Sequence, residues 1–126
     1  RVIILSKEDT ALVNTLQRKA SVVLQKSIRE GFGLTVSEAL FKGTPVIGGN
    51  VGGIRYQIKD GENGFLVNSV DETAQRMKLL LTDEDVQKRL ASRARASVID
   101  NFLLIRLLEQ YLDLMNNFET TYCLRS

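Results

Sequence analysis

Two glutamates flank a glycine-rich bend in the first third of the chain. Glu30 precedes the bend Gly31-Phe32-Gly33, and Glu38 follows it at the start of a predicted helix. A bend that exposes backbone N–H groups before a helix attracts anions, because the unpaired first-turn amides and the helix dipole both favour phosphate. Carboxylates accept hydrogen bonds from hydroxyl groups but repel phosphate. The pattern therefore suits a ligand with a central phosphate and hydroxyl groups on both sides, such as a nucleotide sugar.

Glu38 has two interpretations at this stage. Helical side chains lean toward the N-terminus, so Glu38 in the first turn would point at whatever the amides hold. Thr35 and Glu38 also match the capping box Thr-x-x-Glu, in which the glutamate bonds a backbone N–H at the helix start. The residues alone leave both interpretations open.

The composition is typical of a soluble globular domain and argues against several functions. The 126 residues suffice for one domain, and 17 basic against 15 acidic residues favour neither a nucleic-acid nor a membrane surface. No apolar run approaches the roughly 20 residues that span a bilayer. The chain lacks His, which leaves almost nothing for a zinc site, and we expect no metal and no cofactor. The single cysteine, Cys123, excludes an internal disulfide and favours a reducing, cytoplasmic compartment.

Short apolar runs alternate with helical patterns along the chain. We predict strands at residues 2–5, 22–24, 45–47 and 65–67, since each run is short, apolar and rich in β-branched or aromatic residues. Strands that alternate with helices form parallel sheets, whose ligands bind at the carboxyl ends of the strands. The Glu30 bend and the glycine-rich residues 48–53 fall at such ends. We expect residues 48–53 to form a wall of the site or a tight turn.

Capping residues predict where the helices begin and end. The first helix begins at Ser6, with Asp9 as its capping partner, and runs to about residue 18 with Leu12 and Leu16 inward. The helix after the bend covers residues 35–42 and stops at Gly43, which suits a helix C-terminus. Two later helices are predicted to begin at capping boxes, which are Ser69 with Glu72 and Thr82 with Asp85.

Several motifs resemble one known family. Glu30, seven intervening residues and Glu38 resemble the Glu-x7-Glu motif of retaining glycosyltransferases of GT-B fold, family 4. The resemblance runs from about residue 2 to residue 118 and includes residues 42–48, 51–54 and 60–67. Residues 23–33 are similar to the trehalose-forming members, which are nucleotide-sugar-dependent trehalose synthases and, less closely, trehalose phosphorylases.

The resemblance implies a role for each residue of the motif. Glu30 would be the catalytic residue. The groups that bind the transferred sugar would be Glu30 and the backbone of Gly31, Phe32 and Gly33, with the Phe32 ring in the core. The diphosphate would bind the amides of Leu34 and Thr35, and the ribose would bind Glu38. No metal is implied.

The resemblance also implies that the chain is incomplete. Residues 1–118 would be a partial donor-binding domain, a Rossmann-like parallel sheet with flanking helices from the C-terminal half of a GT-B fold, and residues 119–126 a tail. The first two strands of that domain are missing, together with the Arg and Lys that clamp the diphosphate. The sugar acceptor would bind through a missing N-terminal domain. We therefore expect this chain alone to be inactive.

Three functions remain open. The first is a hexosyltransferase that transfers glucose from a nucleotide sugar to a sugar acceptor, with front-face attack and with the leaving phosphate as the base. The second is a trehalose phosphorylase, in which phosphate replaces the nucleotide and Glu38 has no ribose to bind. The third is a binding module or fragment that does not catalyse.

The last predicted helix, residues 103–117, has more apolar residues than one buried face needs. Such a face requires a stripe of about 100° or somewhat more. Six side chains supply it and are expected to face inward, namely Leu104, Ile105, Leu108, Tyr111, Leu112 and Met115. Leu103, Leu107 and Leu114 remain on a flank, and unpaired strand edges add a second exposed surface. We therefore expect the chain, made alone, to self-associate or to be only marginally folded.

Overall fold

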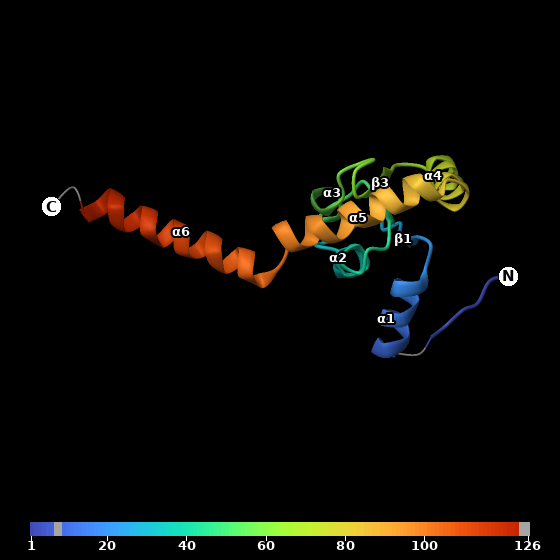
Figure 1. Cartoon of the computed structure of the whole chain (residues 1–126), viewed down its shortest axis with the longest axis horizontal. Coiled ribbons are helices and arrows are strands. Elements are labelled where there is room, and N and C mark those ends of the chain that lie inside the picture. Colours follow the sequence, from blue (N-terminus) through green and yellow to red (C-terminus); the bar gives the residue numbers. More distant parts are fainter. Residues whose placement is uncertain (7–8, 124–126) are drawn as a thin grey trace.

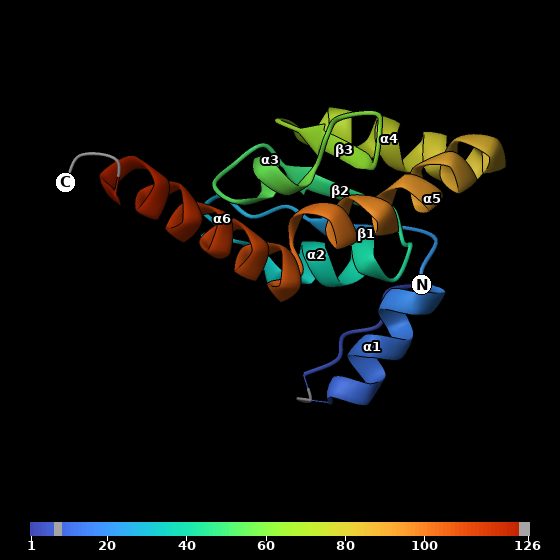
Figure 2. The same ribbon diagram turned by 60° about the vertical axis from the view of Figure 1, so that its left-hand side comes forward.

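The computed structural model describes residues 1–6 and 9–123, with side chains described up to residue 118. Three parallel strands form its sheet in the order β1 (Val23–Gln25), β2 (Val46–Gly49) and β3 (Gly64–Val67). Val23 pairs with Val46, and Val46 with Gly64, so the strands run side by side and end at the same edge. Figures 1 and 2 show helices around this sheet. The predicted parallel α/β fold is confirmed.

Six helices accompany the strands in the described part of the chain. They are α1 (Thr10–Lys19), α2 (Leu34–Phe41), α3 (Ile54–Gln57), α4 (Val70–Thr82), α5 (Glu84–Asn101) and α6 (Leu104–Cys123). Helix α2 packs on β1, β2 and α5, whereas α4 packs on β2, β3 and α5. Helices α2 and α4 therefore hold the sheet between them, and α5 joins the two layers.

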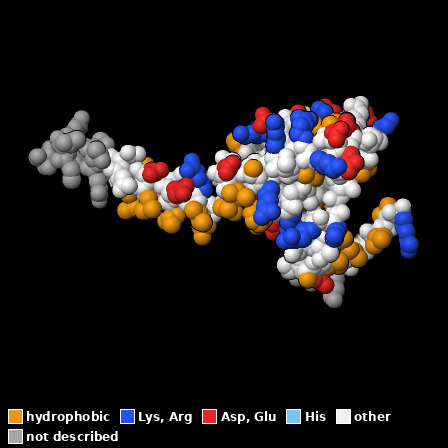
Figure 3. Space-filling view, viewed as in Figure 1, with side chains coloured by type: hydrophobic (Ala, Val, Ile, Leu, Met, Phe, Trp, Pro, Cys, Tyr) orange, Lys and Arg blue, Asp and Glu red, His pale blue; other side chains and the backbone are white. Residues whose placement is uncertain are grey.

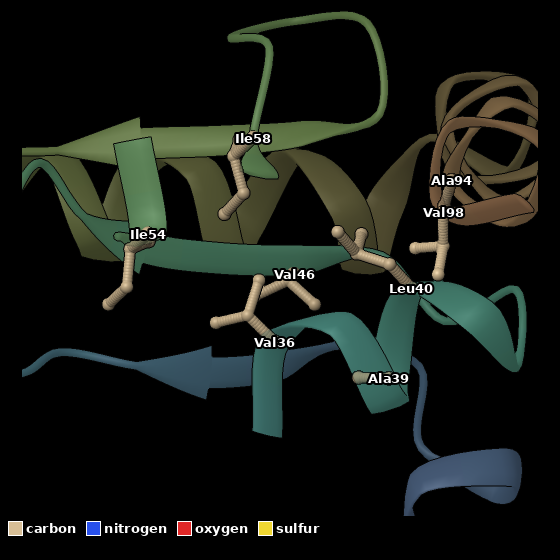
Figure 4. Close-up of a cluster of buried hydrophobic side chains, with 8 residues drawn as sticks. All are labelled: Val36, Ala39, Leu40, Val46, Ile54, Ile58, Ala94 and Val98. Atoms are coloured by element: carbon tan, nitrogen blue, oxygen red, sulfur yellow. The ribbon is translucent and has the colours of Figure 1, made fainter. Parts of the chain in front are cut away.

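Two clusters of buried apolar side chains cover the two faces of the sheet. The cluster shown in Figure 4 joins α2, β2, α3 and α5 through Val36, Ala39, Leu40, Val46, Ile54, Ile58, Ala94 and Val98. The second cluster joins β2, β3, α4 and α5 through Ile47, Phe65, Val67, Leu80 and Leu90. Successive strand residues point to opposite faces, and Val46 and Ile47 accordingly lie in different clusters. Strands β2 and β3 are thus covered on both faces, as in parallel sheets, whereas Leu24 of β1 is 43% exposed.

The predicted strand at residues 2–5 is not formed. Val2 and Ile4 are each 88% exposed, and this segment pairs with no described strand. An apolar, β-branched run forms a strand only where a neighbour supplies hydrogen bonds and its faces are covered. In the described residues β1 pairs only with β2, so no sheet reaches this segment.

Helix α1 also differs from its prediction. It begins after Asp9, whose carboxylate accepts a hydrogen bond from the Leu12 N–H at 2.9 Å, so Ser6 is not the cap. Residues 7–8 lie outside the described residues. Leu12 is half-buried, but Leu16 is 49% exposed, and the buried residue of α1 is Gln17. Gln17 faces inward because its side chain hydrogen-bonds with Glu38 and Lys42, which joins α1 to α2.

The remaining caps test three further predictions. Gly43 follows α2 with φ +77°, which confirms its role at the helix C-terminus. The Ser69 hydroxyl accepts from the Glu72 N–H at 3.1 Å, which confirms the cap of α4. The box at Thr82 is wrong, because α4 continues through Thr82 and α5 is capped by Asp83 instead.

Helix α6 projects away from the sheet and its covering helices (Figure 1), and its apolar side chains gather along one side (Figure 3). The six side chains predicted to face inward are 52–79% exposed, so that prediction is wrong. The reason is that no described element packs extensively against this helix. The helix also continues beyond residue 118, where the tail was predicted to begin, and residues 124–126 lie outside the described residues. No described helix is both long and apolar enough to cross a membrane.

Candidate functional site

The Glu30 carboxylate is held by two side chains from the carboxyl end of β1. Its Oε2 atom accepts hydrogen bonds from the Ser27 hydroxyl at 3.2 Å and from the Gln25 amide at 3.3 Å. The Gln25 amide also donates to the Ser27 hydroxyl at 2.9 Å. Because both donors meet Oε2, the acceptor capacity of Oε1 remains for a ligand hydroxyl. The half-buried carboxylate is thereby oriented before any ligand arrives.

The start of α2 follows this loop at once. Gly33 is the N-cap, with φ +88°, and provides no side-chain cap. The helix begins at Leu34, one residue earlier than predicted, so the amides of Leu34 and Thr35 both belong to the first turn, which has no partners within the helix. Such amides, at the positive end of the helix dipole, are the donors that the predicted anion cradle requires.

Glu38 is not part of a capping box. It is the fifth residue of α2, outside the first turn, and its Oε2 accepts from the Gln17 side-chain amide at 3.1 Å. The Gln17 amide oxygen in turn accepts from the Lys42 ammonium group. The capping interpretation is therefore wrong, and the contact instead joins α1 to α2. Glu38 lies one turn after Leu34 and so shares its face of the helix.

Residues 48–53 lie against the Glu30 loop and support its backbone. Gly48 and Gly49 belong to β2, and Gly53 donates its N–H to the carbonyl of Gly31 at 2.8 Å. A Cβ atom on Gly53 would lie 2.3 Å from the Gly31 oxygen, and one on Gly52 would lie 1.8 Å from the Glu30 oxygen. Glycine is therefore required at both positions, because the two loops touch through their backbones.

Two further side chains fix the loop. The Phe32 ring was predicted to lie in the core, but it is 44% exposed and packs edge-on against Phe102 at the end of α5, with ring centroids 5.9 Å apart, so that prediction is wrong. Gln57 of α3 donates its side-chain amide to the carbonyls of Phe32 and Gly33. The sequence pattern predicted a role for neither Gln25 nor Gln57. The position of Gln25 at the end of a strand, five residues before Glu30, was an available signal, whereas Gln57 had none.

The described residues contain no group of three His, Cys, Asp or Glu side chains that could hold a metal ion. The candidate site brings together two carboxylates, a set of backbone amides and the hydroxyl of Ser27. A parallel sheet with a helix N-terminus and acidic side chains at its carboxyl edge is the arrangement of nucleotide-binding α/β domains.

Comparison with protein families defines this class more closely. The chain belongs to the family described as glycosyl transferases group 1, whose model matches residues 1–97. The family resemblance inferred from the Glu-x7-Glu motif is therefore confirmed.

Curated relatives include trehalose-forming proteins. The chain is 50% identical to the trehalose synthase of Pyrococcus horikoshii over 105 residues, which are 83% of this chain and 25% of that protein. It is 46% identical to the trehalose phosphorylase of Grifola frondosa over 91 residues, which are 71% of this chain and 12% of that protein. The chain thus spans about a quarter of the length of the trehalose synthase that it matches.

Solved structures agree with the fold. Sucrose-phosphate synthase from Thermosynechococcus elongatus matches with a TM-score of 0.80 and 27% identity, over 96% of this chain and 31% of that chain. The Anabaena protein HepE in complex with UDP-glucose matches with a TM-score of 0.73 and 25% identity, over 83% of this chain and 30% of that chain.

Proposed function

We propose that this chain is the donor-binding part of a retaining hexosyltransferase of the trehalose-forming type. The observation that carries the proposal is the oriented Glu30 carboxylate beside the uncapped N-terminus of α2. These groups suit a glucose unit joined to a diphosphate. The 50% identity to a trehalose synthase supports glucose as the transferred sugar.

Each part of the site has a proposed partner on the nucleotide sugar. Glu30 accepts hydrogen bonds from sugar hydroxyls, next to the close backbone approach that Gly31 and Gly33 permit. The amides of Leu34 and Thr35 bind the diphosphate. Glu38 binds the ribose hydroxyls, since it lies on the face of α2 that begins at Leu34.

In the proposed reaction, the main task of this chain is to stabilise the leaving group. It does not need to supply a base. The bond between the anomeric carbon and the phosphate oxygen breaks, and negative charge develops on the departing nucleoside diphosphate. Pre-oriented amides at the helix start stabilise that charge. The acceptor hydroxyl attacks from the same face, which retains the configuration, and its proton passes to the departing phosphate. We propose that the acceptor binds outside this chain.

A trehalose phosphorylase activity is the second candidate, favoured by the 46% identity to the Grifola frondosa protein. In that case inorganic phosphate occupies the cradle, and Glu38 has no ribose to bind. A non-catalytic binding module is the third. Preference for a nucleotide sugar over phosphate separates the first two candidates, and turnover separates both from the third.

The proposed function is tested by removing the charge of Glu30. Glu30→Gln should lower affinity for a nucleoside diphosphate glucose about tenfold, the effect of one hydrogen bond to a charged group. Binding of the free nucleoside diphosphate should hardly change, because Glu30 faces the sugar. Calorimetry with UDP-glucose, ADP-glucose and the free diphosphates measures both affinities.

The matched control is Glu62→Gln, which removes an exposed carboxylate in the turn before β3 and should change neither affinity. Equal weakening of both ligands by Glu30→Gln would mean that Glu30 supports the loop rather than the sugar.

A further inference from the structure

Gln57 is an unusual side chain for the core in which it lies. It is 1% exposed and lies on α3, three residues after the apolar Ile54. Its Nε2 atom donates to the carbonyl oxygens of Phe32 and Gly33, the latter at 3.4 Å. Its Oε1 atom is buried and has no hydrogen-bond partner among the described residues.

The contacts of Gln57 complete a pattern along the Glu30 loop. Four successive carbonyl oxygens, those of residues 30–33, accept hydrogen bonds from the segment of residues 53–57. The Gly53 N–H serves the first two, at 3.4 Å to Glu30 and 2.8 Å to Gly31, and the Gln57 amide serves the other two. Carbonyl oxygens carry partial negative charge and repel an anion, whereas N–H groups attract it. These hydrogen bonds therefore hold the carbonyl oxygens of the loop toward residues 53–57.

The unpaired Oε1 atom indicates that the N–H donor is the functional half of the Gln57 amide. Burying an unpaired acceptor destabilises a fold, and an apolar side chain of the same shape would avoid that cost. What Gln57 contributes in exchange is its N–H donor, aimed at the backbone just before the first turn of α2. Gly33, which receives one of these bonds, is also the left-handed N-cap of that helix.

We propose that Gln57 is a positioning residue of the anion cradle. It holds the Phe32 and Gly33 carbonyls away from the ligand, so that the amides of Leu34 and Thr35 face the diphosphate. The inference rests on the proposed function, and it predicts an effect on the phosphate part of the ligand, in contrast to Glu30, which faces the sugar.

The test replaces Gln57 by methionine, which keeps the unbranched shape and has no N–H donor. Calorimetry on the whole chain should show that Gln57→Met weakens UDP-glucose and free UDP by the same factor, about tenfold, because the Phe32 and Gly33 carbonyls that lose their donor can turn toward the diphosphate. Its melting temperature should stay near that of the wild type, because the orphan oxygen is removed together with the donor. The control Gln87→Met removes another side-chain amide that bonds a backbone carbonyl, that of Ser21, and should leave both affinities unchanged. Where wild-type binding requires the adenine base, ADP-glucose and ADP are the probes.

Three outcomes are separable. Equal affinities of wild type and Gln57→Met overturn the inference and leave the proposed function standing. A wild-type chain that binds neither nucleotide sugar overturns the proposed function and this inference with it. Where Gln57→Met proves unstable in a thermal melt, Gln57→Leu decides: it has neither the donor nor the unpaired oxygen, so unchanged affinity overturns the inference and a tenfold loss supports it.

Discussion

Gly53 lies so close to the Glu30 loop that a methyl group has no room there. Its Cβ would lie 2.3 Å from the Gly31 oxygen and 2.6 Å from the Phe32 Cα. Gly53→Ala should therefore push the loops apart and cost about 1–3 kcal/mol of unfolding free energy, as overpacking does. Thermal or urea melts measure the loss. Gly31→Ala is the control, because a Cβ there meets nothing within 4 Å. Equal stability of the two variants would contradict the backbone contact.

Glu38 has a structural contact and a proposed ligand contact, and one substitution separates them. Glu38→Gln keeps an oxygen that can accept from Gln17, whose amide lies 3.1 Å away, so the melting temperature should change little. If Glu38 binds ribose, affinity for a nucleoside diphosphate should fall by about 1–3 kcal/mol, typical of a hydrogen bond to a charged group. Calorimetry and a melt on the same samples decide. Lost stability with unchanged affinity would assign Glu38 to the joint between α1 and α2 alone.

Single residues of the site were predictable only where a local pattern marks them. Glu30 and Glu38 follow from their spacing around a glycine-rich bend, and the bend predicts the cradle. Gln57 could not be found, since its partners lie 24 and 25 residues away and its neighbours look like an ordinary amphipathic turn. The pairing of Glu38 with Gln17 spans 21 residues and was missed for the same reason.

At the scale of elements, strands with a partner in the chain were predictable and the strand without one was not. Residues 22–24, 45–47 and 65–67 match β1, β2 and β3 within two residues at each end. Residues 2–5 have the same apolar composition but remain exposed, because composition does not reveal whether a neighbouring strand exists. The cap at Asp83 was misplaced by one residue, since Thr82 and Asp83 are both good capping residues.

Helix α6 presents an apolar face that is largely exposed in the described part of the chain. Leu104, Leu108, Tyr111 and Met115 recur at spacings of four and three residues and are 58–79% exposed. This spacing is typical of helices that pack against another helix. We expect the chain to self-associate through this face, with a sedimentation coefficient that rises with concentration.

Leu108→Glu should reduce that association, because it places a charge in the middle of the face. Gln110→Glu, which adds the same charge outside those spacings, should not. Sedimentation velocity of both variants at several concentrations makes the comparison. A wild-type chain that stays monomeric and unfolds cooperatively at every concentration would contradict the prediction.

At the scale of the whole molecule, the fold class follows from the alternation of strands and helices, whereas the position of α6 does not. The two core clusters bury apolar residues from β2, β3 and α2 to α5, with the half-buried Val23 of β1 packed against the first cluster, so the sequence pattern and the packing agree there. The nine apolar residues of α6 up to Phe118 are nevertheless 49–79% exposed. An amphipathic pattern predicts that a face will be covered and does not say by what.

The proposed nucleotide-sugar site lies at the carboxyl edge of the sheet, between the Glu30 loop and the start of α2. An NMR titration of the isotope-labelled chain with UDP-glucose and ADP-glucose tests it most directly, since every backbone amide reports separately. We predict weak, saturable shifts confined to residues 30–38 and 48–53, with the amides of Leu34 and Thr35 among the most affected. Saturable shifts confined to residues 70–118 would contradict the claim.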